Sequence, residues 1–578
     1  MSTMPAATTP AAPAPDAPPG YWQREASHYP KPLTPLASSI VLDSINEAFV
    51  KVFAEFGLPL ERFEFREIGG YVYQAAKPFA VGGAGGTKLP PKPVLWLFFR
   101  LHPALRARYA KSKQALDGRR DRALLDRWGR EWRPRLIRDI ERWRTTETAG
   151  LDDRAFAAHL DDLQRWAFEA MDIHFYLTPP YTLAIFRLHS FCEQHLGYDD
   201  SRTLALLSGL SEMSSEPAVE IAKLADKIKT NGDLAKAIVD ASPVAVPSLL
   251  AERDASLAAA FDQYIDRYGC RALRYELVEQ TLGERPDLVA SLLQDELRKP
   301  GGIASEQARL EAARAEARSN ALAALPDGAL RAQFETLVSE AERAYPVRED
   351  NEFFTVSAPL ALLRFGALEA GERLARHDAI ADAADVFFLR FDELLGGLRE
   401  QGRDSKAIVA QRKQELAEAE AFDPPASYGE EPPQPPLDVL PPSWREVMSA
   451  MVYAMEKIFE PERSNRREAT GARELKGIAA ARGTYTGPAR VIMGEHEFDR
   501  LQTGDVLVCP ITSPVWSILF AKVGALVTDS GGVLSHPAII AREYGIPAVV
   551  ATGNATQIIA DGQQIVVDGE AGVVRLVG

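Results

Sequence analysis

A short segment near the C-terminus, residues 528–550, constrains the fold more than any other part of the chain. An apolar strand ends at Val527, and Gly531 and Gly532 follow it. Two glycines permit a tight turn and let another group approach the backbone closely. The apolar stretch after them has helical spacing, so the pattern predicts a strand, a glycine turn and a helix that starts at His536.

The residues around His536 place its side chain at a helix N-terminus. Ser535 suits the N-cap, and Pro537 suits the first helical position. A helix start offers free N–H groups and the positive end of the helix dipole, which stabilise a phosphoryl group. Imidazole titrates near pH ~6.5, so much of it is a neutral nucleophile at neutral pH. We therefore predict that His536 attacks a phosphoanhydride, whereas the alternative for a lone histidine is capping or packing.

Length and composition indicate several domains in a reducing compartment. The chain has 578 residues, too many for one hydrophobic core, and its formal net charge is −15. That charge argues against a nucleic-acid or anionic-membrane surface. The three cysteines form no CxxC pair, so we expect neither a disulfide framework nor a metal site. The predicted location is the cytoplasm.

Composition divides the chain into four parts. We expect residues 1–20 to be a disordered Ala/Pro tail and residues 21–422 to be a mainly helical domain. Residues 423–473 are predicted as a Pro-rich linker, unable to build a core, followed by an amphipathic helix that carries Trp444 on its apolar stripe. Residues 474–578 change to strand periodicity and predict a compact β/α domain.

The C-terminal domain is predicted in more detail because turns punctuate its apolar runs. The predicted strands are 489–493, 505–509, 525–528, 548–551, 564–567 and 573–577. Helices are predicted near 515–523 and 536–543.

The segment around His536 resembles the phosphohistidine swivelling domain of the phosphoenolpyruvate (PEP)-utilising enzymes. This family includes pyruvate phosphate dikinase, PEP synthase and rifampicin phosphotransferase. Its pattern is a Thr-Asp-x-Gly-Gly turn, a Ser-His core, an Ala-x-x-Ala-Arg-Glu stretch and a Gly-Ile-Pro-Ala-Val run, all present here. Leu534 stands where the dikinases often have Thr, and Pro537 where Ala is usual. The resemblance implies that His536 is the phosphorylated residue.

The stretches 483–491 and 510–514 also look like this domain, so the resemblance covers residues 474–578. It implies a β/β/α swivelling domain with a phosphoryl-binding loop. That loop comprises Gly531, Gly532 and Ser535.

The helical region is similar, more weakly, to the middle domain of rifampicin phosphotransferase-like members. The stretches in family order are Trp22, 28–35, 206–210, 268–271 with Glu276, 348–349, and 385–389 with Glu393. The resemblance implies an acceptor-binding domain, with candidate site residues Arg271, Glu276, Arg348 and Glu349.

Guanidinium groups suit phosphoryl oxygens, so Arg271 and Arg348 are the candidates for binding the transferred group. Glu349 could orient or deprotonate an acceptor hydroxyl. For each of these charged residues, an ordinary structural ion pair is an equally weighted alternative to a role in the site. Cys270 replaces a usual His, and Glu352 replaces a common Lys. An aromatic cluster beside Pro179-Pro180 either lines an acceptor pocket or packs in the core. It consists of His174, Phe175, Tyr176 and Tyr181.

Family members place an ATP-grasp domain before the middle domain, and the pyruvate-using members add a barrel after the swivelling domain. Here the middle-domain signature begins at Trp22 and the sequence ends at Gly578. We therefore expect no tightly bound cofactor on this chain, with ATP and Mg²⁺ bound by a separate ATP-grasp subunit. This arrangement is similar to the larger subunit of phenylphosphate synthases.

The predicted reaction is dikinase-type phosphoryl transfer, from ATP to His536 with release of AMP, and then to a small hydroxyl acceptor, a phenol. One alternative is a phosphocarrier or regulatory protein that passes the group to another protein. A further alternative is PEP synthase-like activity on pyruvate.

Overall fold

The computed structural model describes residues 18–80, 89–210, 212–272, 274–298, 304–400, 403–459, 474–512, 516–520 and 522–577. The predicted tail lies outside these residues except for its last three. The predicted class, a mostly helical region followed by a β/α domain, is confirmed.

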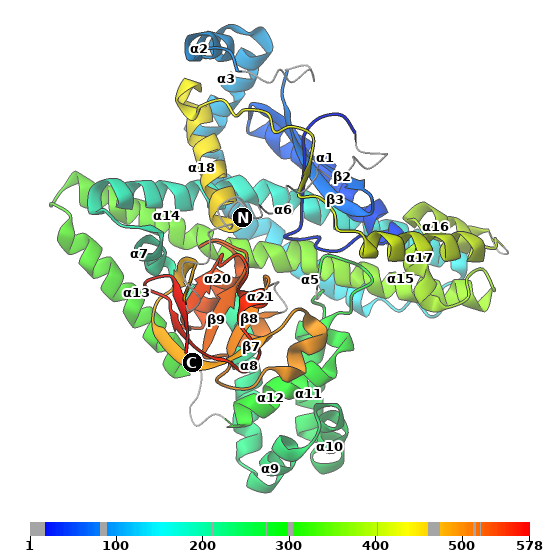
Figure 1. The fold of residues 1–578 in the computed structure, drawn as a ribbon. Helices are drawn as coiled ribbons and strands as arrows, with labels where there is room; N and C mark the ends of the chain where they lie inside the picture. Colours follow the sequence, from blue (N-terminus) through cyan, green and yellow to red (C-terminus); the bar gives the residue numbers. More distant parts are fainter. Residues whose placement is uncertain are drawn as a thin grey trace, which may run out of the picture.

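The helical region is organised around one long helix, α6 (Asp153–Leu196), which runs through two internal prolines. Its neighbours are α1 (Pro35–Glu55), α14 (Ala329–Glu352), α15 (Ala358–Arg376) and α18 (Pro442–Phe459). Helices α6 and α14 lie side by side across the centre of the molecule (Figure 1). A lobe made of α8 (Glu212–Lys229), α9 (Gly232–Asp240), α10 (Val246–Arg253), α11 (Ala255–Tyr268) and α12 (Pro286–Arg298) projects from one side.

The remaining described helices of this region are shorter or peripheral. They are α2 (Lys92–Leu101), α3 (Pro103–Asp117), α4 (Arg120–Arg127), α5 (Arg133–Thr145), α7 (Asp200–Leu204), α13 (Ala304–Ala324), α16 (Phe391–Arg399) and α17 (Lys406–Ala421).

One helical run, Ala329–Arg376, is long and apolar enough to cross a membrane. It consists of α14, the π-helical turn η5 (Phe353–Ser357) and α15. Since 78% of its most apolar window is buried inside the protein, its apolar character is explained by the core that it forms.

An antiparallel sheet interrupts the region that the sequence predicts as helical. Its strands are β1 (Trp22–Arg24), β2 (Leu60–Ile68), β3 (Tyr71–Pro78) and β4 (Ser427–Tyr428), in the order β2-β3-β1-β4. In β2, Phe63 and Phe65 alternate with charged residues and pack against Phe49 of α1. This period of two is the strand signal that a reading of residues 21–422 as helix overlooks.

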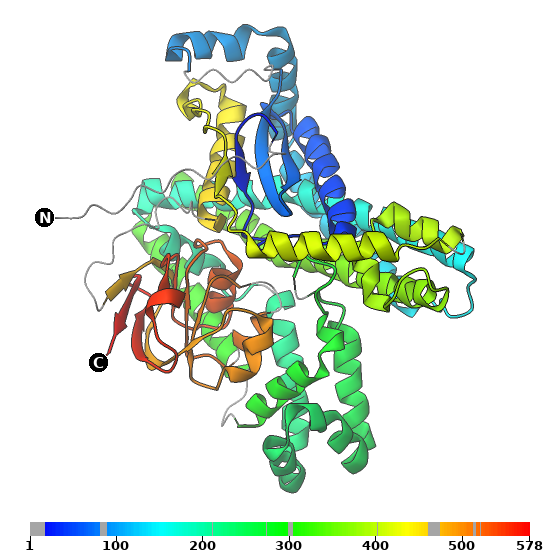
Figure 2. The same ribbon diagram turned by 45° about the vertical axis from the view of Figure 1, so that its right-hand side comes forward.

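The segment 423–442, predicted as a free linker, is instead packed onto the helical region (Figure 2). Tyr428 of β4 is buried, and its ring lies 4.9 Å from that of Tyr73. Further along, Leu440 is buried and the carbonyl of Val439 accepts a hydrogen bond from Arg100. We call residues 423–441 the strap. Its extended backbone fits its prolines, but its apolar side chains find partners, so the prediction that it builds no core is wrong.

The C-terminal domain holds an eight-stranded sheet in the order β5-β12-β11-β7-β8-β9-β10-β6. Strands β7 to β10 are parallel neighbours, and the outer strands pair antiparallel. The strands are β5 (Glu474–Lys476), β6 (Ile478–Ala481), β7 (Thr484–Val491), β8 (Val506–Cys509), β9 (Ala525–Thr528), β10 (Ala548–Val550), β11 (Gln564–Asp568) and β12 (Val573–Leu576). All six predicted strands are present, whereas β5 and β6 were not predicted.

Three short helices complete this domain: α19 (Ser517–Phe520), α20 (His536–Glu543) and α21 (Ala555–Ile558). In both views the domain lies beneath α6 and α14 and beside the α8–α12 lobe (Figures 1 and 2). Its apolar residues share one hydrophobic cluster with that lobe, in which Phe520 and Ile540 join Phe261 and Leu293.

Truncating Tyr428 tests whether the strap holds the N-terminal sheet. We expect Tyr428→Ala to lower the free energy of unfolding by about 3 kcal/mol, because it leaves a cavity where a buried aromatic ring was. Denaturant unfolding followed by tryptophan fluorescence measures this. The exposed neighbour Glu430 supplies the control, since Glu430→Ala should change stability by less than about 0.5 kcal/mol. Equal stabilities would mean that the strap contributes nothing.

Candidate active site

His536 is the first residue of α20, and Ser535 precedes it in extended conformation at the N-cap position. Pro537 is therefore the second helical residue and not the first. The Ser535 hydroxyl does not cap the helix, because it donates to the carbonyl of Gly532 at 2.6 Å and so closes the preceding turn. Gly531 has φ +110°, a backbone conformation that residues other than glycine rarely adopt. The predicted glycine turn thus exists and holds His536 at a helix start.

The turn before His536 is docked on the end of α18. The backbone N–H of Leu534 donates to the carbonyl of Lys457 at 2.7 Å. A Cβ atom on Gly532 would lie 2.2 Å from the same carbonyl oxygen, so only glycine fits there. The position of His536 is therefore tied to the helical region through backbone contacts.

The imidazole ring is held by its own domain. Its Nδ1 lies 2.9 Å from the Thr512 hydroxyl, and Phe520 contacts the ring edge to face at 6.4 Å between centroids. Nε2 is buried and has no hydrogen-bond partner among the residues that the structure describes. When Nδ1 donates to Thr512, Nε2 carries the free lone pair, so Nε2 is the atom placed to accept a phosphoryl group.

Desolvation, and secondarily the charge of Arg348, lower the pKa of His536 to about 3. The ring is consequently neutral at physiological pH, which is the nucleophilic form. Thr512 belongs to the stretch 510–514, which the sequence identifies only as similar to the swivelling domain. Its role as the partner of Nδ1 was not predicted.

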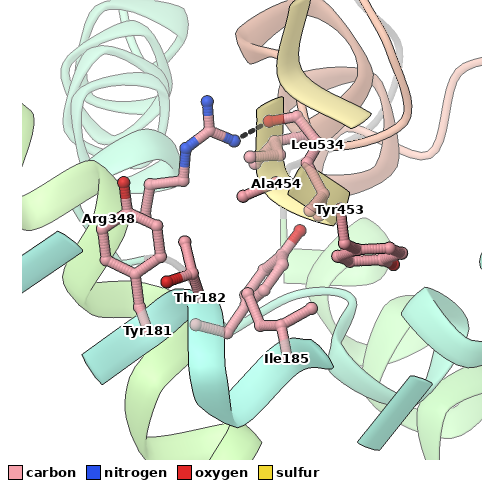
Figure 3. A pocket seen from close by; sticks show the side chains of 9 residues that line it. Tyr181, Thr182, Ile185, Arg348, Tyr453, Ala454 and Leu534 are labelled. Atoms are coloured by element: carbon pink, nitrogen blue, oxygen red, sulfur yellow. Dashed lines mark hydrogen bonds between the residues drawn. The ribbon is translucent and has the colours of Figure 1, made fainter. Parts of the chain in front are cut away.

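Arg348 connects the two parts of the protein at this point. It projects from α14, and its Nη1 donates to the carbonyl of Leu534, two residues before His536 (Figure 3). A small pocket lies beneath this contact, between α6, α14, α18 and the His536 loop. It is lined by Tyr181, Thr182, Ile185, Tyr345, Arg348, Tyr453, Ala454, Leu534 and Ile539. The structure thus brings together His536 and Arg348, which are 188 positions apart in the sequence.

The other predicted acceptor-site residues are placed differently. Glu349 follows Arg348 on α14 and is partly buried. The carboxylate of Glu276 accepts two hydrogen bonds from Thr34, at 3.1 Å from its N–H and 2.7 Å from its hydroxyl, and so anchors the start of α1. Burial raises the pKa of Glu276 to about 7. Arg271 stacks on the Phe353 ring at 4.4 Å and lies near Tyr544 of the C-terminal domain.

A cluster of polar and aromatic side chains lies near Arg348. Glu352 is one turn further along α14, and Tyr275 lies close enough to influence its ionisation. The ring of His28 contacts that of Tyr275 at 5.1 Å, and Tyr29 lies 6.4 Å from Tyr275. The His28 side chain is 40% exposed and Glu352 and Tyr275 are only partly buried, so solvent reaches this cluster. We call these four residues the Glu352 cluster.

Of the predicted aromatic group on α6, two members face the site and two do not. Tyr181 lines the pocket beside Arg348. His174 lies 3.2 Å from the Thr355 hydroxyl, and desolvation lowers its pKa to about 3. Phe175 packs on Phe49, and Tyr176 packs near Trp132. Tyr181 therefore lines a small pocket while Phe175 and Tyr176 pack in the core, and the hypothesis of an acceptor pocket stays a prediction.

Further contacts fasten the C-terminal domain in this position. Glu543 accepts a hydrogen bond from the N–H of Gly209 at 3.2 Å. The buried ammonium of Lys522 lies 3.2 Å from the Asp295 carboxylate of α12, and the Thr503 hydroxyl donates to the same carboxylate. The motifs around Gly209 and Glu543, both noted in the sequence, thus meet at the domain interface.

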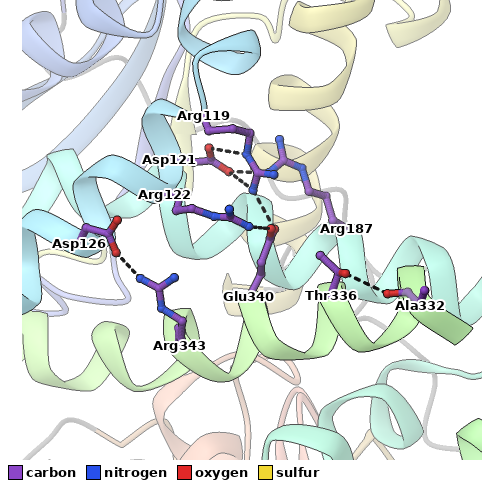
Figure 4. A network of polar contacts seen from close by, with 9 residues as sticks. All are labelled: Arg119, Asp121, Arg122, Asp126, Arg187, Ala332, Thr336, Glu340 and Arg343. Carbon is purple, nitrogen blue, oxygen red and sulfur yellow. Dashed lines mark hydrogen bonds and ion pairs between the residues drawn. The ribbon is translucent and has the colours of Figure 1, made fainter.

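A charge network fixes α14, which carries Arg348 (Figure 4). Glu340 accepts hydrogen bonds from Arg119 at 2.8 Å and from Arg122, which both lie at the start of α4. Arg187 of α6 bridges Asp121 and, at 2.7 Å, Glu446 of α18. Because the network joins four helices, it keeps α14 in a constant position relative to α18 and the docked loop.

Comparison with known proteins identifies two parts of the chain. Residues 501–572 match the mobile domain of PEP-utilising enzymes, and residues 176–349 match the rifampicin phosphotransferase fourth domain. The first match contains Thr512 and His536, and the second contains Arg348. The two residues that the structure brings together therefore come from two separately recognised domains.

Three relatives illustrate the similarity. An uncharacterised phosphotransferase of Bacillus subtilis is 31% identical over 54% of this chain and 36% of its own length. A rifampicin phosphotransferase of a Streptomyces species is 30% identical over 67% of this chain and 43% of its own. The chondramide synthase of Chondromyces crocatus is 29% identical over 96% of this chain but only 14% of its own. The chain thus spans less than half of each of these relatives.

The hydrogen bond between Thr512 and His536 can be tested by phosphorylating His536 with phosphoramidate, a small chemical donor. We expect Thr512→Val to slow the formation of acid-labile phosphate about five- to tenfold, because one hydrogen bond that orients the ring is lost. Thr512→Ser keeps the hydroxyl and should react at nearly the original rate. Equal rates in all three proteins would remove Thr512 from the mechanism.

The docked arrangement should loosen as the pH falls. The pKa of His536 is about 3 when docked, against about 6.5 for free imidazole. Below pH ~6.5 the released domain therefore binds a proton that the docked domain excludes, and release is favoured. Thr512 and Phe520 face the ring from its own domain, and Arg348 faces it from α14 and repels an imidazolium.

Energy transfer between dyes on the two domains measures the docked fraction as the pH is lowered. In His536→Gln, which has no imidazole to protonate, the docked fraction should no longer depend on pH in this range. Persistence of the same pH dependence in that variant would assign the effect to another group.

Proposed function

We propose that this chain, which carries a mobile domain of the PEP-utilising enzymes, transfers a phosphoryl group from Nε2 of His536 to a small hydroxyl compound bound at the helical region. The family match supports a phosphotransferase with a phosphohistidine domain. The observation that carries the proposal is the docked position of His536, with a neutral ring next to Arg348.

The transfer step follows from the chemistry of these groups. The acceptor oxygen attacks the phosphorus of phosphohistidine, the P–Nε2 bond breaks, and Nε2 regains its lone pair as a neutral imidazole. The acceptor proton leaves to a base. Arg348 is charged and close enough to bind the oxygens of the moving phosphoryl group once it releases the Leu534 carbonyl.

The phosphoryl donor in this proposal is ATP, held with Mg²⁺ by a separate ATP-grasp subunit, with AMP and phosphate as by-products. Support comes from the resemblance to the dikinase-type family. To reach such a donor, the mobile domain must leave its docked position and break the contacts at Gly209, Asp295 and Arg348. Residues 460–473, which connect α18 to β5, lie outside the described part of the chain. The cytoplasm is the proposed location.

A phenol is the proposed acceptor. Its hydroxyl is neutral at pH 7 yet ionises near pH ~10, more readily than an alcohol, so a weak base suffices for activation. Aromatic rings of the Glu352 cluster, among them Tyr29 and Tyr275, can stack on an aromatic acceptor. The match to a rifampicin phosphotransferase domain over residues 176–349 is consistent with an organic hydroxyl acceptor.

Two variants test this function in the chain reconstituted with its nucleotide-binding partner. His536→Ala should abolish AMP release and product formation while leaving the fold intact, because the residue is both nucleophile and carrier. Arg348→Ala should leave phosphorylation of His536 unchanged and slow transfer to the acceptor about 100-fold. AMP release with phenols, alcohols and pyruvate, together with product analysis, provides the measurement.

Each contrary result has a defined meaning. Product formation by His536→Ala would reject the phosphohistidine mechanism. Phosphorylation of pyruvate alone would indicate PEP synthase-like activity, and phosphorylation of a protein histidine alone would indicate a phosphocarrier.

A further inference from the structure

Glu352 occupies a special position relative to the reacting group. It lies four residues after Arg348 on α14, so both side chains project from the same face of the helix. Arg348 lies close enough to influence the ionisation of both His536 and Glu352. A molecule placed between Glu352 and His536 would therefore contact Arg348 as well.

One oxygen of the Glu352 carboxylate, Oε1, is buried and has no hydrogen-bond partner among the described residues. Tyr275 lies close enough to influence the ionisation of the side chain. A buried acceptor atom left unsatisfied is unfavourable, and more so when it is charged. A ligand that donates a hydrogen bond to Oε1 would remove this cost.

We propose that Glu352 is the residue that recognises the acceptor. Its Oε1 accepts a hydrogen bond from the acceptor molecule, and its charge makes the site select neutral or cationic hydroxyl compounds over carboxylates. The inference rests on the proposed function, which supplies the reacting hydroxyl. It also explains why a glutamate stands at position 352, where the family that this chain resembles commonly has a lysine.

The surroundings of Glu352 support selection by charge. The groups that face it are Tyr275 and His28 from the loops packed against α14, and Arg348 and Glu349 from α14 itself. Glu25, hydrogen-bonded to His28 at 3.0 Å, adds a further carboxylate. An anionic acceptor would thus meet carboxylates, while Arg348, which lies near His536, is needed to bind the phosphoryl group.

The acceptor site should discriminate more strongly against carboxylates as Glu352 ionises. Burial raises the pKa of Glu352 to about 7, although Tyr275, His28 and Arg348 oppose this rise. Below that pH the carboxyl is protonated and neutral, and above it the carboxylate repels an anionic acceptor. Discrimination against carboxylates should therefore increase as the pH rises through about 7.

Three phenols that differ in charge test the proposal: neutral phenol, cationic tyramine and anionic 4-hydroxybenzoate. Protein phosphorylated on His536 with phosphoramidate and freed of excess reagent is mixed with each. At about pH 8.5, where Glu352 is ionised, we expect tyramine to be preferred over 4-hydroxybenzoate by about 100-fold in kcat/KM, as one attractive and one repulsive charge interaction near a surface would produce. Glu352→Gln should reduce this ratio about tenfold and remove its pH dependence, and Glu352→Lys should favour 4-hydroxybenzoate.

Two controls accompany these variants. Glu335→Lys makes the same charge change at an exposed position of α14 and should keep the original preference. The rate of His536 phosphorylation should be equal in all variants. Because Glu352→Gln nearly preserves shape, it keeps the test valid if Glu352→Lys fails to fold.

The outcomes separate the inference from the function on which it rests. If no hydroxyl compound accepts the group from phosphorylated His536 in the original protein, the proposed function is rejected. If phenols are phosphorylated but the Glu352 variants keep the original preference ratio and its pH dependence, Glu352 does not recognise the acceptor. A changed preference in Glu349→Gln alone would assign that role to Glu349.

Discussion

The arrangement of the whole protein depends on how one residue, Leu534, is held from both sides. Its N–H donates to the Lys457 carbonyl of α18, and its carbonyl accepts from Arg348 of α14. Two backbone groups of the catalytic loop are thus satisfied by the other domain, which fixes the loop in both distance and orientation. The network around Glu340 and Arg187 keeps the two supporting helices in register. His536 can be presented accurately only because these helices behave as one rigid support.

A carrier domain must also be able to leave, and the interface reflects this requirement. Apolar residues such as Phe520 and Ile540 favour docking, whereas undocking exposes Lys522 and Asp295 to water, which solvates both charges well. Arg348 has two competing uses, because the guanidinium that binds the Leu534 carbonyl is also suited to a phosphoryl group. When His536 is phosphorylated, the phosphoryl group therefore competes with the Leu534 carbonyl for Arg348. Phosphorylation thus weakens the contact that holds the unmodified loop.

Local patterns predicted the C-terminal domain well and the helical region less well. Strand β9 and helix α20 begin and end where the sequence placed them, because turn residues bound them. The strap was misjudged, since its proline content describes backbone shape but gives no sign that Tyr428 pairs with a strand about 400 residues earlier. Glu276 was a candidate on residue type, yet its partner Thr34 lies 242 positions away and occupies its carboxylate.

The same limit explains why Arg348 could be proposed from sequence while Glu352 could be noted only as a departure. An arginine suits phosphoryl oxygens wherever it lies, so its residue type carries information. A glutamate in place of a lysine acquires meaning only from its neighbours. Here those neighbours are Arg348, Glu349 and His28, together with the Tyr275 hydroxyl, whose pKa burial raises. In the proposed reaction Arg348 and Glu352 present opposite charges from one face of α14, so one attracts the phosphoryl group while the other excludes anionic acceptors.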